Sequence, residues 1–161
     1  MAVKRVYELT QDGVDKLRDE LNDLIDNKRP QNLEMLKEAR AQGDLSENAD
    51  YDAARNEQGR IEARIIEIEN ILKNAKVIKL SDKDIVEIGK TVKIKYLETK
   101  LETEFQLVGT LEANPVQKRI SVESPIGKAL MGHEKGDKLV VKIAGNKFFN
   151  IEILEITNEV A

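Results

Sequence analysis

The sequence contains no cysteine, no tryptophan and one histidine among 161 residues. Without cysteine the chain can form no disulfide, thiolate zinc site or iron–sulfur cluster, and it has no cysteine nucleophile. The single histidine, His133, excludes metal sites with two histidines and proton shuttles built on two imidazoles. Acid–base or metal chemistry in this protein would therefore use carboxylates.

Excess positive charge and aromatic residues are also missing. Lys and Arg number 26 against 30 Asp and Glu, which gives a net charge of -4. Any contact with DNA or RNA must therefore be local, because the chain as a whole does not attract phosphate. Charged residues make up 35% and aromatic residues 4% of the chain, so we expect an aliphatic core and long solvated helices.

No apolar run approaches the roughly 18 residues that a membrane helix needs. The beginning of the chain, Met1–Val6, is too short and too charged for a signal peptide. We therefore expect a cytoplasmic protein without a membrane partner, and the length allows one ordinary domain or two small ones.

Residues 10–75 have the pattern of two long helices. Glycine and proline are scarce, and apolar residues recur in steps of three and four, as on one helix face. In the first helix this stripe comprises Val14, Leu17, Leu21, Leu24, Leu33, Leu36 and Ala39. In the second helix it comprises Tyr51, Ala54, Gln58, Ile61, Ile65, Ile68 and Leu72.

The ends of these helices are also marked. Thr10 is the expected N-cap of the first helix, and Gly43 is expected to follow its last turn. Pro30 predicts a kink, because proline lacks the amide hydrogen of a regular helix. The short connection 43–48 predicts an antiparallel hairpin in which the two stripes face each other.

After residue 78 the pattern changes to short β-rich segments punctuated by glycine. Ser124 as N-cap and Pro125 at the first helical position predict one short helix among them. The expected strands cover 91–97, 103–111, 119–122, 138–143 and 147–156. The predicted class is α+β, with a helical hairpin over 1–78 and a compact domain over 79–161.

The turn of the hairpin carries two carboxylates, Asp44 and Glu47. In a structural interpretation, Asp44 or Ser46 caps the second helix and Glu47 favours its positive N-terminus. Alternatively, Asp44 and Glu47 bind a hard cation such as Mg²⁺. Proteins usually hold Mg²⁺ with one or two carboxylates together with water and substrate phosphates. The pair would then be half of a site that a partner completes.

Basic residues, namely Lys37, Arg40 and Arg55, lie close to this turn. Ordinary salt bridges between exposed helices are one explanation. The other is a small basic surface that holds a phosphate backbone beside the acidic turn. Acidic residues lie toward the other end of the first helix: Asp12, Asp15, Asp19, Glu20, Asp23 and Asp26.

Two motifs resemble the bacterial Gre transcript cleavage factors. The stretch EARAQGDLSENADYDAAR, residues 38–55, is similar to the tip signature of that family. The stretch SVESPIGKALMG, residues 121–132, is similar to its C-terminal motif. Leu9, Thr10 and Gly13, leading into Leu17, also fit. The resemblance covers essentially the whole chain, and two motifs in the right order are more specific than either alone.

The resemblance implies an α-helical coiled-coil hairpin with an acidic tip at 43–51, followed by an FKBP-like globular domain. It implies a factor that is not itself an enzyme. Such a factor docks at the rim of the secondary channel of bacterial RNA polymerase and inserts the hairpin toward the active centre. There it stimulates Mg-dependent cleavage of the backtracked nascent RNA 3′ end, so that elongation resumes. The Mg²⁺ would be shared with the polymerase and bound weakly by the free protein, and no small-molecule substrate is implied.

The tip residues are assigned by their match to the family motif. Asp44 and Glu47 match the pair that assists the metal, and Arg40 and Arg55 match basic positions near the extruded RNA. Asn48 and Tyr51 match tip positions that bind RNA or support the geometry of the loop.

The second motif is predicted to face the polymerase. Packing of its apolar residues in the core is an equally good explanation. The predicted docking residues are Ser124, Pro125, Ile126, Leu130 and Met131. We expect His133, Phe148 and Phe149 to be structural or docking residues.

Other functions are compatible with parts of the pattern. An inhibitory Gre paralogue would share the fold and the docking, but the presence of both Asp44 and Glu47 favours a cleavage-active factor. A coiled-coil adaptor or chaperone would offer only the apolar groove of the hairpin. A prolyl isomerase is disfavoured because few aromatic residues could line its pocket, namely Tyr96, Phe105, Phe148 and Phe149.

Overall fold

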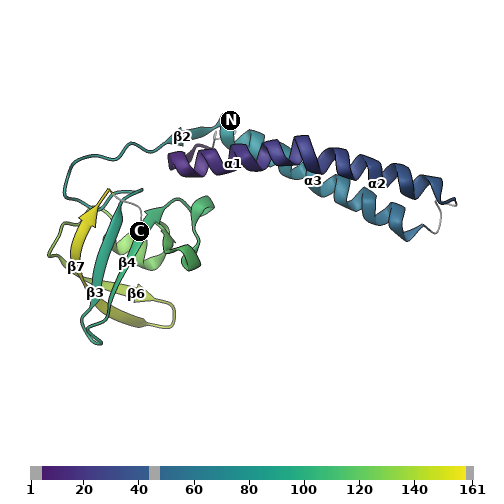
Figure 1. The fold of residues 1–161 in the computed structure, drawn as a ribbon. Helices are drawn as coiled ribbons and strands as arrows, with labels where there is room; N and C mark the ends of the chain where they lie inside the picture. The colour runs from purple at the N-terminus through teal and green to yellow at the C-terminus, as the bar shows by residue number, and fades with distance from the viewer. Residues whose placement is uncertain (1–4, 44–47, 159–161) are drawn as a thin grey trace. The chain divides into compact units, whose positions relative to one another are not determined.

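The computed structural model describes residues 5–43 and 48–158 (Figure 1). The contacts divide the chain into two units, one of Asp12–Ala75 and the other of Tyr7–Gln11 together with the chain from Lys76 onward. The first is a helical hairpin and the second contains a five-stranded sheet, so the predicted α+β class is confirmed. The predicted boundary between 78 and 79 stays a prediction. The structure adds that residues 7–11 group with the second unit.

The hairpin has two long arms (Figure 1). The first arm stays helical through α1 (Gln11–Asp23), a π-helical segment η1 (Leu24–Lys28) and α2 (Arg29–Ala41). The second arm is the single helix α3 (Ala49–Lys73). As predicted, the first helix starts directly after Thr10, and Gly43 follows its C-cap Gln42 with a φ of 113° that suits glycine.

The π-helical segment ends at Lys28, two residues before Pro30. Proline has no amide hydrogen to donate back along the helix, and a π turn contains one residue more than an α turn. After the segment the buried residues of α2 are Asn32, Leu36 and Ala39. Asn32 is 3% exposed and Leu33 is 53% exposed, so placing Leu33 in the buried stripe was wrong.

The interior of the hairpin is aliphatic, with one buried amide. On α3 Ala54, Ile61, Ile65 and Ile68 are buried as predicted, whereas the last buried residue is Ile71 and the predicted Leu72 is only half-buried. The Asn32 Nδ2 donates to the Ala54 carbonyl at 2.9 Å and so joins α2 to α3. The buried apolar side chains are Val14, Leu36, Ala39, Ala54, Ile61, Ile65, Ile68 and Ile71.

Two forked ion pairs join the arms at their surface. Arg64 donates to both carboxylate oxygens of Glu20, at 2.6 and 2.9 Å. Arg29 does the same to Glu62, at 2.8 and 2.9 Å. The hydrogen bond from Arg64 holds the pKa of Glu20 below its ordinary value. These bidentate pairs set the register of the two arms on the solvent side.

The second unit begins with a strand whose pairing partner lies far away in the sequence. β1 (Tyr7–Leu9) pairs with β2 (Ala75–Val77), and the Ile78 amide donates to the Leu9 carbonyl at 2.8 Å. The Thr10 amide and hydroxyl both donate to the Glu112 carboxylate, at 2.8 and 2.5 Å. The segment 7–11 is thus tied to the domain that follows the hairpin in sequence.

The main sheet has the strand order β5-β4-β3-β7-β6. All neighbours are antiparallel except β4 and β5, which are parallel. Each predicted strand has a counterpart: β3 (Thr91–Tyr96), β4 (Glu102–Val108), β5 (Arg119–Ser121), β6 (Lys138–Ile143) and β7 (Lys147–Thr157). Two short 3₁₀ turns, η3 (Thr110–Glu112) and η4 (Pro115–Gln117), connect β4 to β5.

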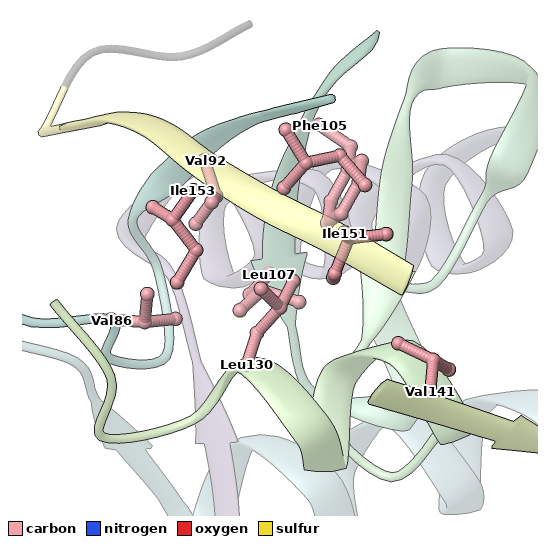
Figure 2. Close-up of a cluster of buried hydrophobic side chains, with 9 residues drawn as sticks. Val86, Val92, Phe105, Leu107, Leu130, Val141, Ile151 and Ile153 are labelled. Atoms are coloured by element: carbon pink, nitrogen blue, oxygen red, sulfur yellow. The ribbon is translucent and has the colours of Figure 1, made fainter. Parts of the chain in front are cut away.

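The predicted short helix is α4 (Pro125–Leu130), and its N-cap is Ser124, whose Oγ accepts from the Gly127 amide at 3.1 Å. Figure 2 shows Leu130 of this helix pointing into a cluster of aliphatic side chains and Phe105. The cluster fills the space between the sheet and α4. Its buried members are Val86, Val92, Ile94, Phe105, Leu107, Leu130, Val141, Ile151 and Ile153.

Candidate functional site

The described part of the tip consists of the end of α2 and the beginning of α3. The N-cap of α3 is Asn48, so the prediction that this position falls on Asp44 or Ser46 was wrong. Asp44 and Glu47 lie outside the described residues. Their role as a metal-assisting pair stays a prediction.

Asn48 contacts both helices. Its Oδ1 accepts from the Tyr51 amide at 3.1 Å, which satisfies a free amide in the first turn of α3. Its Nδ2 donates to the Ala39 carbonyl at 2.6 Å, in the last turns of α2. A side-chain amide can do both because it has a donor and an acceptor.

Tyr51 lies among the arginines of the predicted basic surface. The Arg40 guanidinium carbon is 5.7 Å from the centre of the Tyr51 ring, within the range of a cation–π contact. Hydrogen bonding by Arg40 lowers the pKa of the Tyr51 phenol, with further lowering from the charges of Arg40 and Arg55. The structure therefore brings three of the predicted tip residues together.

These side chains line an open pocket of about 390 Å³ on the hairpin. Its wall combines three cations, one aromatic ring and the apolar surface of two leucines, a composition suited to an anionic group attached to a flat or apolar one. The lining residues are Leu33, Leu36, Lys37, Arg40, Tyr51, Arg55 and Gln58.

Leu33 and Gln58 in this wall were not predicted as site residues. Both fit the apolar stripe in the sequence, so the pattern predicts that they face the partner helix. In the structure Leu33 is instead 53% exposed and lines the pocket. The buried neighbour Asn32 is polar, so an apolar pattern does not indicate that it faces the partner helix.

The described residues alone offer no ready metal site. Across 5–43 and 48–158, no group of three or more His, Cys, Asp or Glu side chains could hold a metal ion. The predicted pair, with two hard carboxylates, has a donor chemistry that fits Mg²⁺ as a partial ligand set.

The second motif, residues 121–132, contains both buried and exposed residues. Leu130 is fully buried in the core, which is the alternative that the sequence left open for this helix. Met131 is 37% exposed, and Pro125 is also exposed. The docking role of Ser124, Pro125, Ile126 and Met131 stays a prediction.

Of the three residues expected to have structural or docking roles, His133 and Phe149 contact other side chains and Phe148 is exposed. His133 Nδ1 lies 3.2 Å from the Asp137 carboxylate, whose pKa is lowered first by the Glu134 amide and then by His133. Phe149 packs on Tyr96 with ring centres 5.4 Å apart, whereas Phe148 is 67% exposed.

A second open pocket, of about 420 Å³, lies beside the end of β7. Lys90, which is 1% exposed, is part of its lining and donates to the Lys83 carbonyl, with the Glu87 carboxylate at 3.7 Å. Asp82, Asp84 and Glu155 also line it. The mixed charges do not favour one class of ligand.

Comparison with known proteins agrees with the arrangement of a helical hairpin and a β-sheet domain. Residues 7–77 match the family model described as transcription elongation factor, N-terminal, and residues 81–158 match that described as transcription elongation factor, GreA/GreB, C-term. The chain belongs to the GreA/GreB family of transcription elongation factors.

Individual relatives match along the whole chain. Transcription elongation factor GreA of Acholeplasma laidlawii is 58% identical over 98% of this chain and 100% of its own length. GreA of Lachnoclostridium phytofermentans is 51% identical over 92% of this chain and 93% of its own. The solved structure of GreA factor homolog 1 (Gfh1) of Thermus thermophilus is 28% identical, covering 94% of this chain and 99% of that one, with a TM-score of 0.44.

The GreA/GreB family member described here has no helix, within 5–43 and 48–158, that is long and apolar enough to cross a membrane. The most apolar of its long helices, α3, alternates its buried isoleucines with charged residues such as Glu62 and Arg64.

Proposed function

We propose that this chain stimulates transcript cleavage by a bacterial RNA polymerase. The hairpin would enter the secondary channel, and the globular domain would dock at the channel rim through the 124–131 segment. Asp44 and Glu47 would reach the active centre at the hairpin tip. The polymerase would then cut its own backtracked RNA and resume elongation, and the factor alone would have no such activity.

One observation supports this proposal above the others. Lys37, Arg40 and Arg55 line one pocket in the turns that adjoin the acidic connection. A net charge of -4 argues against binding of RNA by the chain as a whole, so a local group of cations is the form that an RNA contact would take. The same group is compatible with holding the extruded 3′ end while the cut is made nearby.

Asp44 and Glu47 would hold a Mg²⁺ ion that the polymerase also binds. When bound, the ion stabilises the charge on the attacking or leaving oxygen of phosphodiester hydrolysis. The carboxylates of the chain complete a ligand set and accept hydrogen bonds from water. Arg40 and Arg55 neutralise RNA phosphate, which keeps the 3′ segment in place.

The test uses stalled elongation complexes with backtracked RNA and Mg²⁺. Addition of the protein should shorten the RNA from its 3′ end. Asp44→Asn and Glu47→Gln should abolish this while polymerase binding, measured by competition with the unaltered protein, remains. Asp52→Asn is the matched control, because Asp52 is an exposed carboxylate in the first turn of α3. Full cleavage by the doubly neutralised protein would refute the catalytic role of the pair.

A charge reversal tests the basic surface separately. Arg55→Glu should reduce cleavage at limiting factor concentration without unfolding the protein, because it places a negative charge in the pocket. Arg60→Glu is the control, since Arg60 lies on the same helix, is 77% exposed and contacts Glu57 outside the pocket. Cleavage by Arg55→Glu equal to that of both the unaltered protein and Arg60→Glu would show that Arg55 is only a solvated residue.

A further inference from the structure

The tip of the hairpin, where α2 is connected to α3, contains a set of three linked contacts. The Asn48 side chain joins the Ala39 carbonyl on α2 to the Tyr51 amide on α3. The Arg40 guanidinium, on the residue after Ala39, lies over the Tyr51 ring at 5.7 Å. The same two points of the helices are therefore linked twice, once through the Asn48 amide and once through the Arg40–Tyr51 stack.

We infer that Asn48 and Tyr51 are positioning residues for the tip, which hold the two helix ends and the Arg40 and Arg55 guanidiniums in place without binding RNA themselves. This inference rests on the proposed function for its effect on cleavage. Its structural part concerns the free protein and can fail independently.

The chemistry of Asn48 favours this role over direct RNA binding. Turning its amide toward RNA would leave the Tyr51 amide hydrogen without its cap and break the link to Ala39. Ser or Asp could replace the capping oxygen at this position, but neither supplies the amide donor that reaches the Ala39 carbonyl. A serine N-cap can also donate, as Ser124 does to the Ser121 carbonyl, but its single hydroxyl is shorter than the Asn48 amide, which carries a separate acceptor and donor.

Tyr51 has a related role toward the arginines. Two guanidiniums in one pocket repel each other, and a phenol oxygen close to both can accept hydrogen bonds from them. Both arginines affect the Tyr51 phenol, and both line the pocket with Lys37. The ring also covers one face of Arg40. Tyr51 thus gathers positive charge from α2 and α3 on one surface.

The position of Asn48 matters because it ends the connection from α2. Gly43 follows α2, Asn48 caps α3, and the four residues between them include Asp44 and Glu47. Fixing the Asn48 side chain on Ala39 fixes the start of α3 relative to the end of α2. Catalytic groups held by such a connection are sensitive to the position of its ends, because displacements of about 1 Å can cost about a hundredfold in rate.

The first experiment measures the free protein by nuclear magnetic resonance. In the unaltered chain the Tyr51 ring, whose centre is 5.7 Å from the Arg40 guanidinium carbon, should shift the side-chain protons of Arg40. Asn48→Ser and Asn48→Asp keep a capping oxygen and lose the amide donor, so they should lose much of this shift while α3 stays helical. Asn56→Asp, the same chemical change at an exposed position of α3, should leave it intact. An unchanged Arg40 shift in both Asn48 variants would overturn the inference, whatever happens in cleavage.

The second experiment measures cleavage over a range of factor concentrations. Asn48→Ser should lower the maximal rate by about tenfold or more, as for other losses of positioning, with little change in the half-maximal concentration. Tyr51→Phe keeps the ring but removes the oxygen shared by the arginines, so it should also lower the maximal rate and should retain the Arg40 ring-current shift. A wild-type maximal rate for Asn48→Ser would overturn the positioning role. Failure of the unaltered protein to stimulate cleavage would instead refute the proposed function.

Discussion

The sharpest test of the hairpin compares two neighbouring isoleucines of α3. Ile65 is 3% exposed and Ile66 is 66% exposed. Replacing each with alanine removes the same atoms from the same helix and changes its intrinsic helix propensity equally. Any difference in stability between the two variants therefore reports packing against the other arm of the hairpin.

The structure allows both losses to be estimated. Three carbon atoms at about 0.8 kcal/mol each give a transfer term of roughly 2.4 kcal/mol for the buried side chain. A residual cavity brings the expected loss for Ile65→Ala to about 2–4 kcal/mol. Because Ile66 is 66% exposed, only about a third of the transfer term applies to Ile66→Ala. The higher helix propensity of alanine offsets about 0.5 kcal/mol of this loss. That variant should remain within about 0.5 kcal/mol of the unaltered protein.

The assay is thermal and urea unfolding of the full chain, followed by far-ultraviolet circular dichroism to record the helices. Ile65→Ala should lower the thermal midpoint by at least about 4 °C, even if both units unfold together. Ile65→Asp should cost more, since it also buries a charge without a partner. Equal losses for Ile65→Ala and Ile66→Ala would refute the assignment of the buried face.

Two further predictions concern polar links. Glu20→Gln should lower the free energy of unfolding by about 0.5–1 kcal/mol, because the pair with Arg64 is forked but more than a third exposed. The loss should nearly vanish in an Arg64→Met background. Arg64 lowers the pKa of Glu20 below 4.5, so the stabilisation from this pair should be complete above that pH and should disappear as the pH falls through the lowered pKa. If Glu20→Gln still lowered the free energy of unfolding in stronger acid, the ion pair would not be its cause. Glu112→Gln should lower the free energy of unfolding by about 1 kcal/mol, because it weakens the two hydrogen bonds from Thr10. Hydrogen exchange at the Thr10 amide should become faster. Unchanged exchange would mean that this contact does not hold the segment 7–11.

Long elements and their caps could be predicted from the sequence. The apolar repeat runs through almost all of the 25-residue α3, and five strand-like segments follow residue 78, most of them separated by turns that contain glycine. Ser124 followed by Pro125 predicted the start of α4, and Gly43 predicted the end of α2. Such signals are local, because they depend on side-chain direction and backbone conformation within a few residues.

Part of the tip could be predicted in the same way. The basic residues Lys37, Arg40 and Arg55 were evident near the turn, and the structure places them around one pocket. The contribution of Tyr51 could not be derived from spacing, since its ring meets Arg40 only when the two helices pack side by side. The same holds for Asn48, because a capping asparagine does not reveal in sequence which carbonyl its free amide will meet.

The sequence by itself determined the order and type of the long elements, the aliphatic character of both cores and the membership of the family. Only the tertiary structure decided that Asn32 and not Leu33 is buried on α2, because the buried amide bonds to the Ala54 carbonyl on the partner helix and an apolar pattern cannot show such a bond. It also decided that Thr10 meets Glu112, which lies 102 residues away. Local periodicity carries no information about such distant partners, and strands as short as β1 and β2 become stable only when the rest of the fold brings them together.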